Sequence, residues 1–234
     1  MKKTLKLIAL SILLVSFTFK NPVLNNKFFV KSVKFKDSDL KILTIKKNSM
    51  NFSVSTENHQ NFDFYMNSNF FTKSGDPIGE VIINGKKINN RVKYGGFFYV
   101  INGVPGISSG SRPKNVQYSC QTKYIGIING KINKRITNSG INKDNAYRTL
   151  IGKNKQGDLI IIHSDRFGMI SMTDICEIGV QKGITLGLIF DGGSSVDIGI
   201  TDKNQSHSFK SVPSFAKALA NIDEPPVYIT GKFN

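Results

Sequence analysis

Short apolar stretches bounded by turn residues recur along this chain, and this pattern predicts strands rather than long helices. The stretches are rich in Ile, Val and Phe, which favour strands. The expected strands cover residues 40–45, 61–66, 81–83, 97–101, 124–128, 158–163, 186–190 and 227–229. Asn84-Gly85 and Asn129-Gly130 each follow a strand and are typical of a two-residue hairpin turn. Residues 103–110 are rich in Gly and Ser, and we expect a loop there.

Helical signals are few along the chain. Ser171 offers a hydroxyl cap and Asp174 an acid three residues later, which marks the start of a helix. This helix is expected to end near Gly183, between two of the expected strands, and a last helix is expected over 214–221. The pattern as a whole predicts an α+β fold, in which a strand-rich, mixed and twisted sheet with two or three helices forms a single domain.

The N-terminus differs in composition from the rest. Residues 1–20 join a lysine-bearing start to a mostly apolar run, which is typical of a secretory signal. The run is shorter than the roughly 20 apolar residues that span a bilayer comfortably. Residues 21–38 are expected to form an extended approach, and residues 39–234 the domain. We expect export to the periplasm, the cell surface or the medium, with an uncleaved N-terminal membrane anchor as the alternative.

The chain is strongly basic, with a formal net charge of +16. Four lysines of the N-terminal segment carry +4 of this charge and leave +12 on the remainder. Such a balance is compatible with nucleic acid, anionic polymers or phosphate-bearing substrates. Export and the absence of a nucleic-acid motif argue against a nucleic-acid partner. A solvated lysine-rich surface is the favoured explanation of the charge, and an anionic substrate is compatible with it.

Cysteines and histidines give no sign of a metal centre. Cys120 and Cys176 can form one disulfide outside the cytoplasm, or remain two free thiols, since Cys176 falls on the core face of the expected helix. The three histidines show no ligand spacing. We therefore expect no metal and no cofactor.

The most informative polar cluster follows the expected strand at 186–190. Asp191 stands where this strand ends, and Gly192 and Gly193 then allow positive φ and the close approach of a ligand. Ser195 adds a hydroxyl. A carboxylate at a strand end, beside exposed N–H groups, is a common site for a polyanion or a sugar. On its own the cluster is more typical of a tight turn.

Three further groups lie at expected strand ends. Residues Asn67 to Phe71 combine amides that suit sugar hydroxyls or phosphate oxygens with a phenylalanine wall, although a strand-ending turn is the alternative. Arg148 is a lone cation amid apolar residues, and its planar fork fits phosphate unless it forms a structural ion pair. Asp165 can act as an acid or a base.

In order and spacing these clusters resemble the phosphodiester glycosidase family, over roughly residues 40–230. Asn69 replaces the usual Gly and Phe190 the usual Leu, whereas the family's Asn, Arg and Asp are all present. The motifs that carry the resemblance are Asn67-Ser68-Asn69-Phe70-Phe71, Pro77-x-Gly79, Gln121-Thr122, Arg148-Thr149-Leu150-Ile151-Gly152 and Asp191-Gly192-Gly193-Ser194-Ser195.

The resemblance implies hydrolysis of a sugar-1-phosphodiester, or of a phosphate-containing glycan, between the anomeric carbon and the phosphate. It implies that Arg148 binds the phosphate and that Asp191 activates water or stabilises the oxocarbenium-like centre. Asp165 is expected as the second carboxylate, ahead of Glu80. The implied substrate-binding residues are Asn67, Phe71, Gln121, Thr149, Gly192, Gly193 and Ser195.

Two other functions fit the same residues. A non-catalytic cell-surface module that binds phosphate-rich glycans would use the Arg and Asn without an essential carboxylate. A metal-dependent phosphodiesterase would hold a divalent cation between Asp191 and Asp165. We rank the glycosidase first, the binding module second and the phosphodiesterase third.

Overall fold

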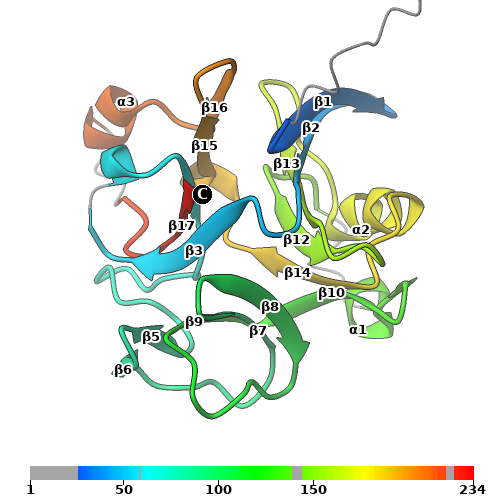
Figure 1. Ribbon diagram of the computed structural model, residues 1–234. Helices are drawn as coiled ribbons and strands as arrows, with labels where there is room; N and C mark the ends of the chain where they lie inside the picture. The colour runs from blue at the N-terminus through cyan, green and yellow to red at the C-terminus, as the bar shows by residue number, and fades with distance from the viewer. Residues whose placement is uncertain (1–25, 58, 139–143, 220–223) are drawn as a thin grey trace, which may run out of the picture.

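Three antiparallel sheets and three short helices make up the computed structural model (Figure 1). The structure describes residues 26–57, 59–138, 144–219 and 224–234, so the expected N-terminal segment 1–20 lies outside it. The α+β class, rich in strands and with three helices, is confirmed. The sequence predicted a mixed sheet, whereas the pairings among the described strands are antiparallel.

A seven-stranded sheet carries hydrophobic cores on both of its faces. Successive side chains alternate between the faces, so Leu43 and Ile161 enter one core while Ile42 and Ile162 enter the other. In spatial order its strands are β1 (Phe28–Phe35), β2 (Ser38–Ile45), β13 (Leu159–Ser164), β12 (Thr149–Lys153), β14 (Leu186–Phe190), β10 (Tyr124–Ile128) and β11 (Lys131–Ile132).

The helix α2 (Met172–Gln181) connects β13 to β14 and packs on this sheet (Figure 1). The hydroxyl of Ser171 accepts a hydrogen bond of 3.0 Å from the N–H of Asp174, which confirms the predicted cap. The strand β12 lies between β13 and β14 and is antiparallel to both. The strand–helix–strand unit that delivers Asp191 is therefore present, with one strand inserted between its two strands.

The other two sheets have five strands each. Two further helices are shorter than α2: α1 (Lys134–Thr137) and α3 (Ser214–Leu219). No helix in the described part of the chain combines the length and the apolar content that a membrane crossing needs. The second sheet contains β16 (Ser206–Lys210), β15 (Asp197–Thr201), β4 (Phe64–Asn67), β17 (Tyr228–Phe233) and β3 (Met50–Ser55). The third contains β6 (Lys86–Asn89), β5 (Val81–Ile83), β9 (Tyr118–Thr122), β7 (Gly96–Ile101) and β8 (Val104–Ser109).

The predicted hairpin turns are present, but one loop prediction is wrong. Asn84 and Asn129 have φ near +52°, and the glycine after each is also left-handed, as a two-residue hairpin turn requires. Asn102 repeats this geometry with φ of +51°. Residues 104–109 consequently form β8, paired with β7, rather than the expected loop. The Gly at 106 has a packing reason, because a Cβ there would lie 2.2 Å from the Tyr99 ring.

Several strand limits also differ from the prediction. Gln121 and Thr122 precede the expected strand, β10, and also form the end of β9, a strand that the sequence pattern did not predict. Part of the expected approach at 21–38 forms β1, which is hydrogen-bonded along its length to β2. A short 3₁₀ turn, η1 (His59–Asn61), precedes β4, which starts at Phe64. The residues of β1 and the end of β9 thus contribute paired backbone to the sheets.

Both cysteines are free thiols buried in the cores. Cys120 belongs to the core between the sheets, and Cys176 to the core beneath α2. The seven-stranded sheet separates these two cores, so of the two interpretations left open by the sequence the free thiols are the correct one.

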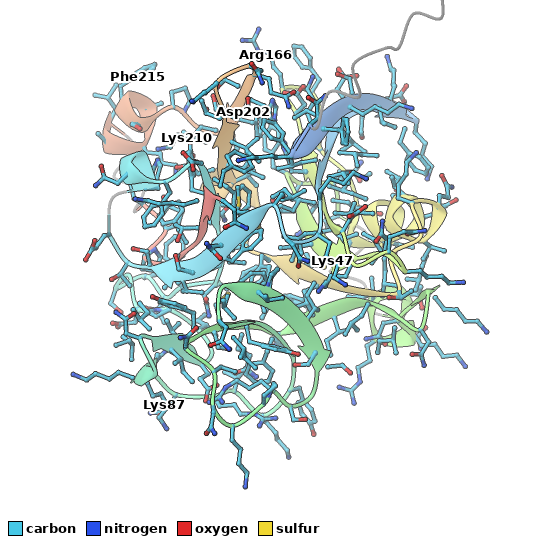
Figure 2. All side chains as sticks on the ribbon, viewed as in Figure 1. Lys47, Lys87, Arg166, Asp202, Lys210 and Phe215 are labelled. Atoms are coloured by element: carbon cyan, nitrogen blue, oxygen red, sulfur yellow. The ribbon has the colours of Figure 1, made fainter. Side chains whose placement is uncertain are left out.

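Positive charge is spread over the surface of the molecule. Lys47, Lys87 and Arg166 are exposed, follow or belong to different strands, and lie on separate parts of the molecule (Figure 2). For these residues the structure agrees with a solvated basic surface.

Candidate active site

Strand ends from all three sheets come together at Asp191, one of the predicted site residues. From the seven-stranded sheet, β14 ends at Phe190, directly before Asp191. From the second sheet, β4 ends at Asn67, whose Nδ2 donates a hydrogen bond of 2.9 Å to the backbone carbonyl of Asp191. From the third sheet, β9 ends at Thr122, whose hydroxyl donates to the carbonyl of Ile189 at 2.5 Å.

Arg148 lies beside Asp191 across the β12–β14 ladder. Thr149 and Phe190 are the last paired residues at this end of the ladder. Arg148 and Asp191 are the next residues of the same antiparallel register, so they stand opposite one another. The arginine motif and the aspartate motif of the resemblance are therefore neighbours in space.

The Asp191 carboxyl group is buried, with 8% of the residue exposed, and this burial raises its pKa to about 6. Hydrogen bonds from the Ser195 hydroxyl and from the Gly192 N–H, 3.0 Å from Oδ1, favour the charged form and limit the rise. The positive charges of Lys217 and Arg148 act in the same direction. The group therefore changes its protonation state close to neutral pH, as a general acid or base requires.

The Arg148 guanidinium is half-buried and only partly satisfied. Its Nη2 donates to the carbonyl of Asp144 at 3.1 Å. Its Nε and the Thr149 hydroxyl are buried without a hydrogen-bond partner among the described residues. Burial lowers the pKa of Arg148, but a guanidinium starts so high that it stays charged. A half-buried cation with a buried, unused N–H can bind an anion.

Asn67 and Gln121 are wholly buried, and their amides bind backbone groups. Besides its bond to Asp191, the Asn67 side chain accepts from the N–H of Asp197 at 3.1 Å. The Gln121 Oε1 accepts from the N–H groups of Glu80 at 3.1 Å and Val92 at 3.0 Å. Both amides fix the backbone around the site, and their contact with a substrate stays a prediction.

The glycines of the loop after β14 have two distinct functions. A Cβ at Gly192 would lie 2.3 Å from the carbonyl oxygen of Tyr147, so only glycine fits against the start of β12. Gly193 has φ of +62°, and the space where its Cβ would point is open. A 3₁₀ turn, η3 (Gly193–Ser195), then brings the Ser195 hydroxyl back to Asp191.

Phe71 lies at the edge of this region. It is half-buried and forms an isolated backbone bridge with Pro77. Its neighbour Phe70 packs edge-on against the Tyr124 ring, with 5.4 Å between the ring centroids. The aromatic wall expected from the sequence is thus partly used in packing.

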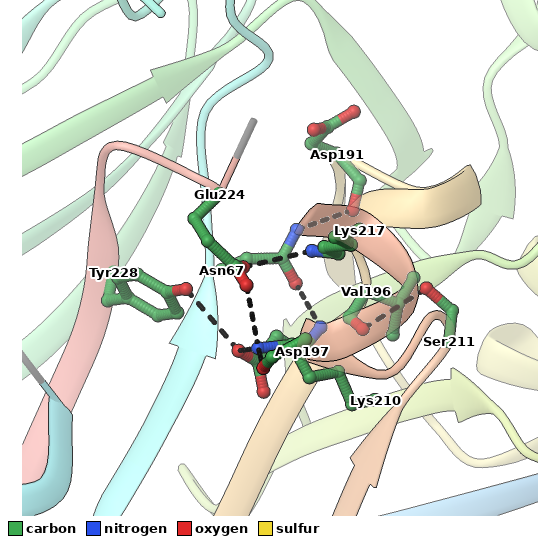
Figure 3. Close-up of polar contacts among 10 residues, drawn as sticks. Asn67, Asp191, Val196, Asp197, Lys210, Ser211, Lys217, Glu224 and Tyr228 are labelled. Carbon is green, nitrogen blue, oxygen red and sulfur yellow. Dashed lines mark hydrogen bonds and ion pairs between the residues drawn. The ribbon is translucent and has the colours of Figure 1, made fainter. Parts of the chain in front are cut away.

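Lys217 is a site residue that the sequence did not reveal. Its side chain is 1% exposed, and its Nζ contacts the Glu224 carboxylate at 3.0 Å. Figure 3 draws it in one cluster of polar residues with Asn67, which holds the backbone of Asp191, and its positive charge lowers the pKa of Asp191. Lysines are abundant in this chain and no motif includes Lys217, so only the folded arrangement identifies it.

The two other candidate carboxylates have partners of their own. Asp165 forms an ion pair of 3.2 Å with Lys41, and Glu80 one of 2.5 Å with Arg112. Burial opposes the charged form of Asp165, but the Arg166 N–H and Lys41 outweigh it and lower the pKa. No contact in the described structure joins Asp165 to Asp191. The described residues also contain no cluster of three or more His, Cys, Asp or Glu that could hold a metal ion.

Fold and site together define a class of α+β protein in which a buried carboxyl group and a partly satisfied guanidinium meet at converging strand ends. A sequence model of the phosphodiester glycosidase family matches residues 60–221, and the chain belongs to this family. No curated protein sequence matches it.

Solved structures share the fold at low sequence identity. The catalytic domain of zebrafish N-acetylglucosamine-1-phosphodiester alpha-N-acetylglucosaminidase, auto-inhibited by its pro-peptide, matches with a TM-score of 0.67 and 14% identity, over 88% of this chain and 82% of that one. A hypothetical protein from Synechocystis matches with a TM-score of 0.61 and 13% identity, over 88% of this chain and 62% of that one. These likenesses establish the architecture and leave the substrate open.

Proposed function

We propose that this chain is an exported hydrolase that cleaves a sugar-1-phosphodiester, for example a GlcNAc-1-phosphate diester, between the anomeric carbon and the phosphate. The observation that carries the proposal is the pairing of Arg148, which has a buried and unused Nε–H, with the buried carboxyl group of Asp191. Family membership supports glycoside chemistry for this pair. The zebrafish relative is named for the same type of bond.

The bond to be broken sets what each group does. Water forms a bond to the anomeric carbon, the carbon–oxygen bond electrons pass to the phosphate, and one proton of the water is released. Phosphate is a good leaving group, so the main requirements are to bind it and to stabilise the positive sugar centre. Arg148 meets the first requirement, and ionised Asp191 meets the second or accepts the proton of the water.

The remaining predicted residues shape the site in this proposal. The unused Thr149 hydroxyl adds a donor beside Arg148. The open space at Gly193 lets a ligand approach the backbone. Asn67 and Gln121 hold the surrounding backbone, and Phe71 lies at the edge. Asp165 stays the proposed second carboxylate, in a position where it is already paired with Lys41.

Export is supported by the N-terminal pattern of the sequence. One further structural neighbour, a Burkholderia pseudomallei protein that is named as exported, has a TM-score of 0.53 and 8% identity over 83% of this chain and 74% of that one. We propose that the substrate is met outside the cytoplasm, at the cell envelope.

The test is hydrolysis of a GlcNAc-1-phosphate diester in ¹⁸O-labelled water. Cleavage at the anomeric carbon places the label in the sugar, whereas a metal-dependent phosphodiesterase places it in the phosphate and is stopped by chelation. Asp191→Asn and Arg148→Ala should each lower kcat/KM by about 10²-fold or more. Arg166→Ala, which removes an exposed arginine, is the matched control. Binding without product, or full turnover by the folded Asp191→Asn and Arg148→Ala variants, would contradict the proposal.

A further inference from the structure

The helix α3 buries its lysine and exposes its large apolar residues. Phe215 is 70% exposed and Leu219 is 86% exposed, and Figure 2 shows Phe215 at the surface of the molecule. The Lys217 side chain between them is 1% exposed. Amphipathic helices normally turn their apolar face inward, and burying an ammonium group is unfavourable unless it is paired. The inverted arrangement calls for a reason in the surroundings of Lys217.

The partner of Lys217 is shared with a second lysine. The Glu224 carboxylate contacts Lys217 at 3.0 Å through one oxygen and Lys210 at 3.1 Å through the other. Lys210 has another acid in reach, Asp197 at 3.3 Å, whereas the only ion pair of Lys217 among the described residues is with Glu224 (Figure 3). The Glu224 side chain is 47% exposed, so its carboxylate can move into water when another anion takes its place on Lys217.

Lys217 is also within electrostatic reach of the proposed catalytic carboxylate. Burial is the main influence on the pKa of Asp191 and raises it, while the charge of Lys217 lowers it, as does that of Arg148. Arg148 lies directly before β12, opposite Asp191, whereas Lys217 belongs to α3. Two cations from different elements therefore act on one carboxyl group.

We propose that Lys217 is the second cation of the phosphate subsite and that Glu224 is its exchangeable counterion, displaced when a phosphate oxygen binds. The inference rests on the proposed function for the identity of the leaving group. A phosphodiester carries one negative charge, and cleavage at the anomeric carbon releases a phosphate monoester that carries up to two. A second cation stabilises this added charge, which is greater in the transition state than in the bound substrate.

A purely structural ion pair gives a different pattern of results. If Lys217 and Glu224 only fastened α3 to the chain before β17, removing either partner would change anion binding in the same direction, or not at all. If Glu224 competes with phosphate for Lys217, the two substitutions act in opposite directions. The sign of the effect, and not its size alone, separates the two functions.

The experiment measures the Kd of inorganic phosphate by calorimetry for the full chain and four variants. We expect Lys217→Met to weaken binding by about tenfold or more and Glu224→Gln to tighten it by a few-fold, in line with charge-assisted hydrogen bonds to phosphate. Lys210→Met, which removes the other ammonium on Glu224, should change Kd much less. Lys217→Arg should restore most of the binding. With the GlcNAc-1-phosphate diester, Lys217→Met should lower kcat more than it raises KM.

Shifts of Kd in the same direction for Lys217→Met and Glu224→Gln would overturn the proposal, as would unchanged binding with a lower Tm. If Lys217→Met does not fold, Glu224→Gln decides alone, since only tighter phosphate binding supports a displaced counterion. Opposite shifts in a protein that hydrolyses no sugar phosphodiester would support the phosphate subsite and refute the proposed reaction.

Discussion

Asp191 is held between burial, which favours its neutral form, and four groups that favour its charged form. In the proposed reaction the ionised carboxylate is the active form. Because burial raises the pKa of Asp191 to about 6, activity should rise as pH increases through that value. The sign follows from the acid: above its pKa it is deprotonated, and below it the carboxylate is lost.

This pH dependence can be moved by one hydroxyl. Ser195→Ala removes a hydrogen bond that favours the charged form, so the rising limb of kcat/KM should shift upward by about one pH unit. The measurement is a pH profile of kcat/KM on the GlcNAc-1-phosphate diester. Ser194→Ala, at the neighbouring position, is the matched control. An identical limb in both variants, or activity that falls as pH rises through 6, would contradict the assignment.

Asp165 allows a second test at the same scale. Asp165→Asn keeps the shape of the side chain but removes the charge that pairs with Lys41. If Asp165 is the second carboxylate, kcat should fall by about 10²-fold or more with little change in stability. Lys41→Met, which removes the other half of the pair, shows the effect of losing the ion pair alone. Equal and small effects of the two substitutions would leave Asp165 with a structural function.

Sequence reasoning singles out a candidate site residue where its chemistry and its position along the chain coincide. Asp191 follows an apolar strand and precedes two glycines, and Arg148 has no charged neighbour in sequence, so each could be noticed without a structure. Lys217 could not, because its burial depends on Glu224 and on the contacts of α3. Nor did the sequence show that the Asn67 and Gln121 amides bind backbone groups.

At the scale of single elements, local signals were sufficient wherever a specific hydrogen bond defines an end or a turn. The cap at Ser171 and the Asn-Gly turns at 84–85 and 129–130 were predicted for that reason. The strand at 104–109 was missed because its Gly and Ser residues suggested a loop. The Asn-Gly pair at 102–103, which closes the β7–β8 hairpin, was the signal that could have identified it.

The helix α2 gives a stability prediction. Ser171→Ala removes the side chain that accepts from the Asp174 N–H, and this should lower the free energy of unfolding by about 1 kcal/mol. Ser171→Asp retains an acceptor at the cap and should cost less. Urea unfolding measures both. The helix α2 packs on one face of the seven-stranded sheet, and the core shared by the three sheets lies on the other face, so kcat/KM should change little. If Ser171→Ala loses no stability, the cap contributes nothing.

At the scale of the whole molecule, the assembly of three sheets depends on pairings between residues far apart in the chain. β3 pairs with β17, for example, in a register that joins Met50 to Phe233. Short strands specify such partners weakly, because many registers bury a similar apolar face. The fold class was therefore predictable from the sequence, whereas the order of the strands and the meeting of three sheets at Asp191 were not.

The same assembly determines the state of the cysteines, even in a protein that we expect to be exported. Cys120 and Cys176 are wholly buried in different cores, and burial raises the pKa of Cys176 to about 12 and that of Cys120 further. Buried thiols with such pKa values hold almost no thiolate, which is the reactive form. Neither thiol should react with Ellman's reagent in the native protein, and both should react in guanidinium without a reductant. Reductant should leave Tm unchanged. If both thiols react only after reduction, the protein contains a disulfide. The seven-stranded sheet would then not separate the two cysteines.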